Sequence, residues 1–549
     1  MKVKKMFKGL VASSVLLTSL VAIDAMADKK QRNVTVIPQV QFSEQGVSCF
    51  DLAKCDEILV NELNVDTRKA AEFFNDYLKK AQLKTVDVNV VSQNSSGVKI
   101  IIDLRSELPI KEEGYELKIV DNKISIKASS ASGLFYALQT IRQLLPSCVE
   151  NKKIEVGALK LPNVEIKDAP RYRWRGLMLD ESRHFFGKDI VKKLLDTMAF
   201  YKMNRFHWHL TDTDGWRFEV KKYPKLTTIG SRGDRTNPNG ELMFYTQEDI
   251  KEIVKYAQER HIMIIPEVDM PGHATAAAKA YPEISGGGSE KYPEFTFNPG
   301  KQVTYDFLEN VLRETAQLFP SPYIHYGGDE VHFANKQWLK DPAILKLMKE
   351  KNLKNLHEVE WYFNRKMSKF INGLGRKTVA WDEVIAADVP PNEAVMMWWR
   401  HDRVKSLDKS LEKGYQVVLC PRLPMYFDFV QSTTHKSGRV WGNPGIADLP
   451  LVYDFPKFVE KYPLEQRQQI LGVQANIWTE QIRENERLFF MTYPRIAGAA
   501  AAGWTMQKNK DYQEFLEKLK DNFKRYDAWG INYYDVFTDS EEVKHTEKK

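Results

Sequence analysis

Cysteine is scarce in this chain, with four residues among 549. Four cysteines are too few for a disulfide scaffold, and their spacing does not match a zinc site. Cys49 and Cys55 are close enough in sequence to close a small disulfide loop in an oxidising compartment. Cys420 lies in the apolar run VVLC, which predicts a buried thiol rather than a reactive one.

A long block of one charge is also missing. The 80 basic and 73 acidic residues leave a formal net charge of +7, and after residue 27 the chain has no long basic block beyond short lysine pairs. Nucleic-acid binding therefore has little support. No apolar run after residue 27 is long enough to span a membrane, so we expect no membrane span in the mature chain.

Residues 1–27 have the pattern of a signal peptide. An apolar run over residues 10–23 is followed by Asp24-Ala25-Met26-Ala27, which is an A-x-A cleavage site. The charged start before this run consists of Lys2, Lys4, Lys5 and Lys8. The run is too short for a typical membrane anchor. The cleavage site has no cysteine to which a lipid could be attached. We expect cleavage after Ala27 and export to the periplasm or the medium.

Residues 28–168 predict a small accessory α+β domain. Residues 98–104, 115–120 and 123–128 have strand character, and residues 131–145 carry apolar side chains at helical spacing. A segment containing proline and aspartate, residues 161–170, is the predicted connection to the second domain.

Residues 169–549 predict a (β/α)8 barrel, which makes the whole an α/β protein. Eight short apolar runs occur, with helical segments such as 189–202, 246–260 and 305–318 between them, and 511–526 predicts a C-terminal helix. The runs are residues 176–180, 205–210, 262–269, 323–326, 378–381, 394–399, 416–420 and 471–478. Such barrels carry their chemistry at the carboxyl ends of the strands, and polar residues collect there in this sequence.

Two adjacent carboxylates, Asp329 and Glu330, follow the fourth predicted strand in the stretch IHYGGDEVH. Read alone, the pair could be an exposed turn or part of a metal site. The preceding pair Gly327-Gly328 lets the backbone bend and leaves room for a ligand. Adjacent residues of a strand point to opposite sides, so we expect the carboxylates to reach different atoms of one ligand. The position of the Asp329-Glu330 pair at the end of a barrel strand favours a catalytic role.

The other strand ends supply candidate binding residues. His207 and His209 lie on one side of the second strand, a spacing that suits metal ligands as well as packed histidines. Several tryptophans at one rim build an apolar box, which together with carboxylates is the composition of a closed carbohydrate pocket. The candidates are Arg183, Asp212, His273, Trp381, Trp398, Trp399, Tyr426, Asp428, Trp478 and Glu480.

In this combination the chain resembles the glycoside hydrolase family 20 β-N-acetylhexosaminidases. The resemblance covers nearly the whole mature chain, and the N-terminal segments GYELKI and GLFYALQTIRQLL resemble the accessory domain of that family. The catalytic motifs occur in order over residues 170–505: LDESRHF, FHWHLTDTDGWRFE, PEVDMPGHA, HYGGDEVH, AWDE, MMWWR, MYFDF, ANIWTE and YPRIAGAAAAGWT.

The resemblance implies a retaining, substrate-assisted mechanism, in which the 2-acetamido oxygen of the substrate attacks the anomeric carbon and an oxazolinium intermediate forms. It makes Glu330 the general acid and base, Asp329 the residue that orients the acetamido group, and Tyr426 a donor to the acetamido oxygen. We expect Glu330 to hold a proton near neutral pH and Asp329 to stay ionised. The enzyme would release terminal N-acetylglucosamine or N-acetylgalactosamine from glycoconjugates or chitooligosaccharides, without metal or cofactor.

By the same resemblance, the remaining candidates bind the sugar or support the carboxylate pair. Arg183 would hold the 3- and 4-hydroxyls, while Asp428 and Glu480 would accept the 4- and 6-hydroxyls. The pocket walls would be Trp381, Trp399 and Trp478, with Trp398 able to fill one of these places, and Asp212 and His273 would lie beneath the pair.

Two other functions remain open from the sequence. The first is a metal-dependent barrel hydrolase that uses His207 and His209, with His273 and His325 as further ligands. The second is a sugar-binding protein that has lost catalysis, against which the intact pair and Tyr426 argue. The sequence does not distinguish gluco from galacto substrates.

Overall fold

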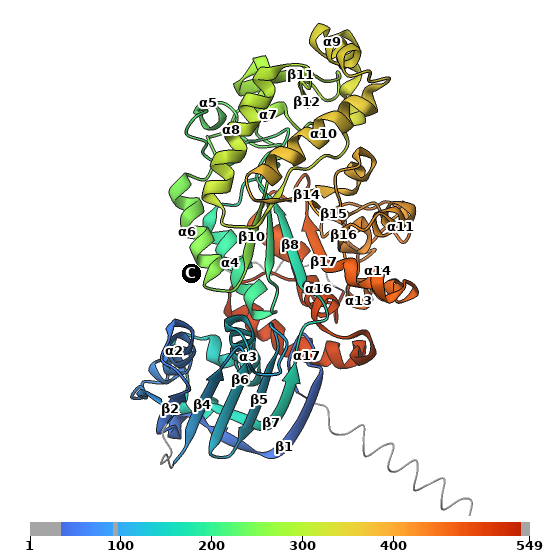
Figure 1. The fold of residues 1–549 in the computed structure, drawn as a ribbon. Helices are drawn as coiled ribbons and strands as arrows, with labels where there is room; N and C mark the ends of the chain where they lie inside the picture. The colour runs from blue at the N-terminus through green and yellow to red at the C-terminus, as the bar shows by residue number, and fades with distance from the viewer. Residues whose placement is uncertain (1–33, 92–96, 540–549) are drawn as a thin grey trace, which may run out of the picture. The chain divides into compact units, whose positions relative to one another are not determined.

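The computed structural model describes residues 34–91 and 97–539, which form two compact units (Figure 1). The division falls between Ala169 and Pro170, and residues 37–39 group with the second unit. The predicted signal peptide, residues 1–27, lies outside the described residues.

The first unit is an α+β domain. In its described part, residues 34–91 and 97–169, one mixed sheet has seven strands in the order β1-β7-β5-β6-β4-β2-β3. The strands are β1 (Phe42–Asp51), β2 (Glu57–Val60), β3 (Val88–Val90), β4 (Lys99–Leu104), β5 (Tyr115–Val120), β6 (Lys123–Ala128) and β7 (Lys160–Asp168). The helices α2 (Val65–Lys80) and α3 (Ala131–Leu144) accompany the sheet.

The period-two pattern of this domain becomes one buried sheet face. β5 pairs with β6 in antiparallel register, with Leu117 opposite Ile126, and both side chains are fully buried. Helix α3 packs on these two strands. The predicted strands at 98–104, 115–120 and 123–128 and the helix at 131–145 are thus confirmed. The prediction of a connection at residues 161–168 is wrong: these residues form β7, because Val164 and Ile166 bury against the sheet in spite of Pro162.

The second unit is a closed barrel of parallel strands. The order β10-β13-β14-β15-β16-β17-β8-β9 places β17 beside β8, so the last strand closes on the first (Figure 1). Each of the eight predicted runs overlaps one of these strands, and the predicted (β/α)8 barrel is confirmed. The strands are β8 (Trp174–Asp180), β9 (Arg205–His209), β10 (Met263–Glu267), β13 (Tyr323–His325), β14 (Lys377–Trp381), β15 (Ala394–Trp398), β16 (Gln416–Leu419) and β17 (Ile470–Ile477).

The barrel follows from strands that are apolar on both faces and from helices that are apolar on one face. All seven residues of β8 are buried. The longer helices are α4 (Lys188–Phe200), α6 (Gln247–Gln258), α8 (Gln302–Leu318), α10 (Leu356–Gly373), α11 (Val404–Glu412), α16 (Arg495–Trp504) and α17 (Tyr512–Ala528). In α4, Val191, Leu194, Leu195 and Met198 recur at helical spacing and are buried. Helix α17 confirms the predicted C-terminal helix.

Shorter elements lie between the longer ones. The helices are α5 (Lys225–Thr228), α7 (Thr275–Ala280), α9 (Pro342–Glu350), α12 (Arg422–Met425), α13 (Leu449–Asp454), α14 (Leu464–Gln469) and α15 (Asn485–Thr492), and a small sheet pairs β11 (Ser285–Gly287) with β12 (Thr296–Phe297). Across residues 34–91 and 97–539, none of the helices combines the length and the apolar character that a membrane span needs.

All four cysteines are free thiols in this structure, so the Cys49–Cys55 disulfide suggested by the sequence is not formed. Cys49 is exposed on β1, whereas the Cys55 thiol faces the carbonyl of Glu57 at 3.5 Å. Cys420 is buried as predicted.

One buried arginine holds the segment that follows β16. The Arg495 guanidinium, on α16, donates to the carbonyl oxygens of Phe427, Phe429 and Ala447 at 2.6–2.8 Å. Burial lowers the pKa of Arg495 to about 9. The segment so fixed, residues 426–430, carries Tyr426 and Asp428, two of the predicted site residues.

We expect Arg495→Met to lower the free energy of unfolding by about 3–5 kcal/mol, because three buried carbonyls lose a charged donor. Arg495→Lys should lose less, since it keeps the charge but cannot reach all three carbonyls. Denaturant unfolding followed by tryptophan fluorescence measures both changes. Wild-type stability in Arg495→Met would contradict this role.

Candidate active site

A cavity of about 550 Å³, open to solvent, lies at the carboxyl ends of the barrel strands. Its lining comes from segments that follow seven of the eight strands, which the barrel topology brings to one rim. The residues that line it are Arg183, Asp212, Asp269, His273, Asp329, Glu330, Trp381, Trp399, Arg422, Tyr426, Arg439, Trp441, Trp478 and Glu480. Ten of the predicted site residues are among them, and two, Trp398 and Asp428, are not.

The two adjacent carboxylates follow β13 in an irregular segment, not in an extended strand. Gly327, Gly328 and Glu330 all have positive φ angles, of 73°, 93° and 54°. A Cβ atom on Gly327 would lie 1.7 Å from Asp269 Oδ1, and one on Gly328 would lie 2.4 Å from Val384. The glycines therefore allow a turn that no other residue fits. The predicted strand-like alternation is wrong here, since this turn directs Asp329 and Glu330 into the same cavity.

The two carboxylates differ in their exposure. The side chain of Glu330 is 33% exposed, whereas that of Asp329 is 12% exposed. Burial raises the pKa of Asp329 to about 7, with Glu330 adding to the shift and His273 opposing it. Burial thus works against the expected ionisation of Asp329 near neutral pH. His273 Nε2 lies 3.7 Å from Asp329 Oδ2 and 3.8 Å from Glu330 Oε2.

Asp212 links His273, which lies beside these carboxylates, to Arg183 on the cavity wall. Its Oδ1 lies 2.9 Å from His273 Nδ1, and its Oδ2 lies 3.0 Å from His209 Nε2 and 2.7 Å from Arg183 Nη2. Although burial opposes it, Arg183 and His273 hold the pKa of Asp212 well below its usual range. His273 thus lies between Asp212 and the carboxylate pair, which Asp212 itself does not contact.

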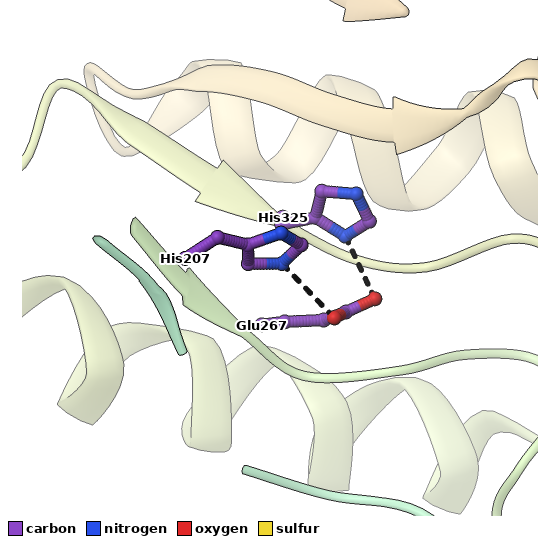
Figure 2. A group of neighbouring side chains, drawn as sticks. All are labelled: His207, Glu267 and His325. Carbon is purple, nitrogen blue, oxygen red and sulfur yellow. Dashed lines mark ion pairs between the residues drawn. The ribbon is translucent and has the colours of Figure 1, made fainter. Parts of the chain in front are cut away.

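Beneath Asp212, a buried carboxylate gathers imidazole rings from neighbouring strands. Glu267 Oε2 lies 2.5 Å from His209 Nδ1 and 3.0 Å from His207 Nε2, and its Oε1 lies 2.9 Å from His325 Nδ1. Figure 2 shows His207 and His325 on the two strands that flank the strand of Glu267, both directed at Glu267. Trp381 Nε1 donates to Oε1 at 3.1 Å. Against the effect of burial, the three histidines hold the pKa of Glu267 well below its usual range.

These groups bear on the metal alternative, because three sets of buried ligand-type residues occur in the described ranges, among them His207, Glu267 and His325. His207 Nδ1 receives an N–H of Gln474 at 3.1 Å, and His325 Nδ1 receives the N–H of Gly327 at 3.0 Å. The lone pair of His207 Nδ1 is thus engaged by a protein donor, and His325 Nδ1 faces Glu267 Oε1 as well as the N–H of Gly327. This arrangement favours a hydrogen-bonded network.

Aromatic rings form the walls of the cavity. Trp399 stacks with Tyr426, with ring centroids 6.4 Å apart and an interplanar angle of 11°. Trp478 lies 5.9 Å from Trp381 and 6.1 Å from Tyr426. Trp399 Nε1 donates to Glu383 at 2.9 Å, which fixes the ring plane. The three tryptophans predicted as walls come together in one apolar box.

Two predicted site residues do not reach the cavity. Trp398 ends β15 with its Nε1 donating to the carbonyl of Arg403 and its ring against Phe458, because alternation along the strand places it opposite Trp399. Asp428 is 2% exposed and lies behind Arg439, whose Nε is 2.7 Å from Asp428 Oδ2.

Four cavity residues escaped the sequence analysis: Asp269, Arg422, Arg439 and Trp441. Asp269 ends the third predicted run and could have been found as a carboxylate at a strand end. The other three lie in the long segment between β16 and β17, where only Tyr426 and Asp428 had a recognisable motif. Nothing in the sequence indicates which residues of that segment turn inward.

Comparison with known proteins agrees with this site. The glycosyl hydrolase family 20 catalytic domain matches residues 172–507, and domain 2 of the same family matches residues 33–169. A β-hexosaminidase of Porphyromonas gingivalis is 34% identical over 534 residues, which are 94% of this chain and 67% of that protein. One of Vibrio furnissii is 36% identical over 417 residues, covering 72% and 66%. This chain thus spans about two thirds of both relatives.

Solved structures show the same architecture. The exo-β-N-acetylglucosaminidase of Vibrio harveyi, in complex with N-acetylglucosamine, has a TM-score of 0.80 at 30% identity, covering 91% of this chain and 78% of that one. The β-N-acetylhexosaminidase of Bacteroides fragilis has a TM-score of 0.78 at 30% identity, covering 92% and 98%. The barrel, its accessory domain and these matches show that this chain belongs to glycosyl hydrolase family 20 and is a glycoside hydrolase.

Proposed function

We propose that this protein is an exo-acting, retaining β-N-acetylhexosaminidase that works by substrate-assisted catalysis. The observation that carries the proposal is that Asp329, Glu330 and Tyr426 line one small cavity with tryptophan walls. The names of the relatives support a substrate with a terminal N-acetylhexosamine. Export to the periplasm or the medium stays a prediction from residues 1–27.

Glu330 suits the transfer of a proton to the leaving group. Its carboxylate lines the cavity and is partly exposed, so the same group can first protonate the glycosidic oxygen and then activate water. His273 is held protonated, since Asp212 and other carboxylates raise its pKa well above the ordinary value although burial opposes this. Its Nε2 lies 3.8 Å from Glu330 Oε2, which places a positive charge beside the carboxylate that must activate the water.

Asp329 suits the acetamido group of the substrate. Burial raises its pKa to about 7, and Asp329 Oδ1 has no hydrogen-bond donor among the described residues. The acetamido N–H would supply that donor, and the positive charge that develops on the ring would favour the ionised form. Tyr426, on the opposite wall, would donate its hydroxyl to the acetamido oxygen and direct it at the anomeric carbon.

The cavity accommodates one terminal sugar. Aromatic rings close its sides, while Arg183 is held by Asp180 at 3.2 Å and Asp212 at 2.7 Å at the end away from the leaving group. A pocket closed in this way accepts a chain end and excludes an internal residue of a polymer.

Aryl glycosides that differ only at C2 and C4, with product stereochemistry recorded by NMR, test this function. Cleavage without a 2-acetamido group, or with inversion, would contradict it.

Substitution of Glu330 and substitution of Asp329 should affect activity differently. We expect Glu330→Gln to lower kcat/KM about 100-fold or more on N-acetylglucosaminides with poor leaving groups and far less on activated aryl glycosides, because only the former need protonation. Asp329→Asn should lower both by about 100-fold or more, since both need acetamido participation. Glu350→Gln, at an exposed position of α9, is the matched control and should change neither. Near wild-type turnover in both site variants would refute the assignment.

The pH dependence should report Asp329. Its raised pKa of about 7 means that the protonated fraction grows as the pH falls below 7, so kcat/KM should decline on that side. His273 lowers this pKa, and His273→Gln should therefore move the inflection to higher pH. His357→Gln, which alters an exposed histidine, should leave it in place. An inflection that His273→Gln leaves unchanged or moves downward would exclude this origin.

Metal removal distinguishes the alternative hydrolase. Because Glu267, Gln474 and the backbone of Gly327 engage the nitrogens of His207 and His325, we expect prolonged treatment with EDTA to leave the activity unchanged. Added zinc should likewise give no gain. Loss of activity with EDTA and recovery with zinc would establish the metal-dependent function instead.

A further inference from the structure

An arginine stands between the two carboxylates that were expected to bind the far hydroxyls of the sugar. Arg439 Nη2 donates to Glu480 Oε1 at 3.0 Å, and Arg439 Nε lies 2.7 Å from Asp428 Oδ2. Arg439 and Glu480 line the cavity, whereas Asp428 does not. The guanidinium therefore presents N–H groups at a place where the sequence predicted two acceptors.

The backbone fixes Arg439 in this position. The N–H of Arg439 donates to the carbonyl of Asp428 at 2.9 Å, and the N–H of Val430 donates to the carbonyl of Arg439 at 3.1 Å. Gly438 permits this approach, because it has a φ of 126° and a Cβ there would lie 2.7 Å from Val430. The contact is thus between two ordered segments, one of which Arg495 also holds.

The charges at this end keep Arg439 cationic and Glu480 anionic. Burial alone would lower the pKa of Arg439, but the charges of Asp428 and Glu480 outweigh burial and raise this pKa. Arg183 and Arg439 lower the pKa of Glu480 in spite of burial, whereas burial raises the pKa of Asp428 to about 7. Each arginine is thus matched by a carboxylate, so a neutral hydroxyl suits this end better than an anionic substituent.

From this geometry we infer that Arg439 is a specificity-determining residue that donates a hydrogen bond to a hydroxyl oxygen at the C4–C6 edge of the terminal sugar, in place of Asp428. The inference rests on the proposed function, because that function places the edge of the sugar against Glu480. The Arg439 side chain is 30% exposed and no partner of its Nη1 occurs among the described residues, so a donor remains for the substrate.

The test compares hydroxyl dependence in the wild type and in variants. The substrates are 4-nitrophenyl N-acetyl-β-D-glucosaminide and its 4-deoxy and 6-deoxy analogues. We expect the wild type to lose about 10- to 100-fold in kcat/KM on at least one deoxy analogue, because a charged donor is left without its acceptor. In Arg439→Met the loss on that analogue should shrink to within about 3-fold. An equal loss in wild type and variant would overturn the inference.

Folding is controlled with a second pair of variants. Arg439→Met leaves the charge of the buried Asp428 unpaired, which could prevent folding. The double variant Arg439→Met/Asp428→Asn removes that charge as well. It should show the same small loss of kcat/KM on the deoxy analogue. Asp428→Asn alone retains the arginine and should keep the wild-type loss. If Asp428→Asn removed the dependence and the double variant added nothing, Asp428 would be the contact and the inference would fail. Failure of the wild type to cleave the parent glycoside would instead refute the proposed function.

Discussion

The active site depends on one buried ionic chain that runs from the barrel interior to the reacting carboxylates. Glu267, His209, Asp212 and His273 alternate in charge, with contacts of 2.5, 3.0 and 2.9 Å. Burying any of these charges alone would be strongly unfavourable, and each is tolerated because the next lies within hydrogen-bonding distance. The chain ends at Asp329, whose remaining oxygen has no partner among the described residues.

Burial also makes the two adjacent carboxylates, Asp329 and Glu330, different from each other. Asp329 is buried and has a pKa of about 7, so its ionisation responds to the group that occupies the cavity. Glu330 is partly exposed and is the more accessible of the two carboxylates. Positive φ angles at Gly327, Gly328 and Glu330 allow two neighbours in sequence to line one cavity in different surroundings. The backbone turn thus sets the chemistry of the pair.

Much of the fold and of the candidate site was predictable from the sequence, because both depend on local pattern and on motif spacing. The eight apolar runs predicted the barrel strands, and the place of Asp329 and Glu330 after the fourth run predicted their position at the rim. Trp398 could not be separated from Trp399 by type, since only strand alternation decides which of the two faces the cavity. β7 was missed because Pro162 reads as a break, whereas sheet pairing on both sides stabilises it.

By itself, the sequence determined the barrel, the family and the place of the carboxylate pair at the barrel rim, since these depend on short-range periodicity and on motifs that stay contiguous along the chain. Only the tertiary structure decided that Arg439 covers Asp428, that Glu267 gathers histidines from two neighbouring strands, and that Asp329 is buried enough to raise its pKa. Each of these depends on distances between residues far apart in sequence. Burial and charge pairing are properties of such distances, which no local pattern specifies.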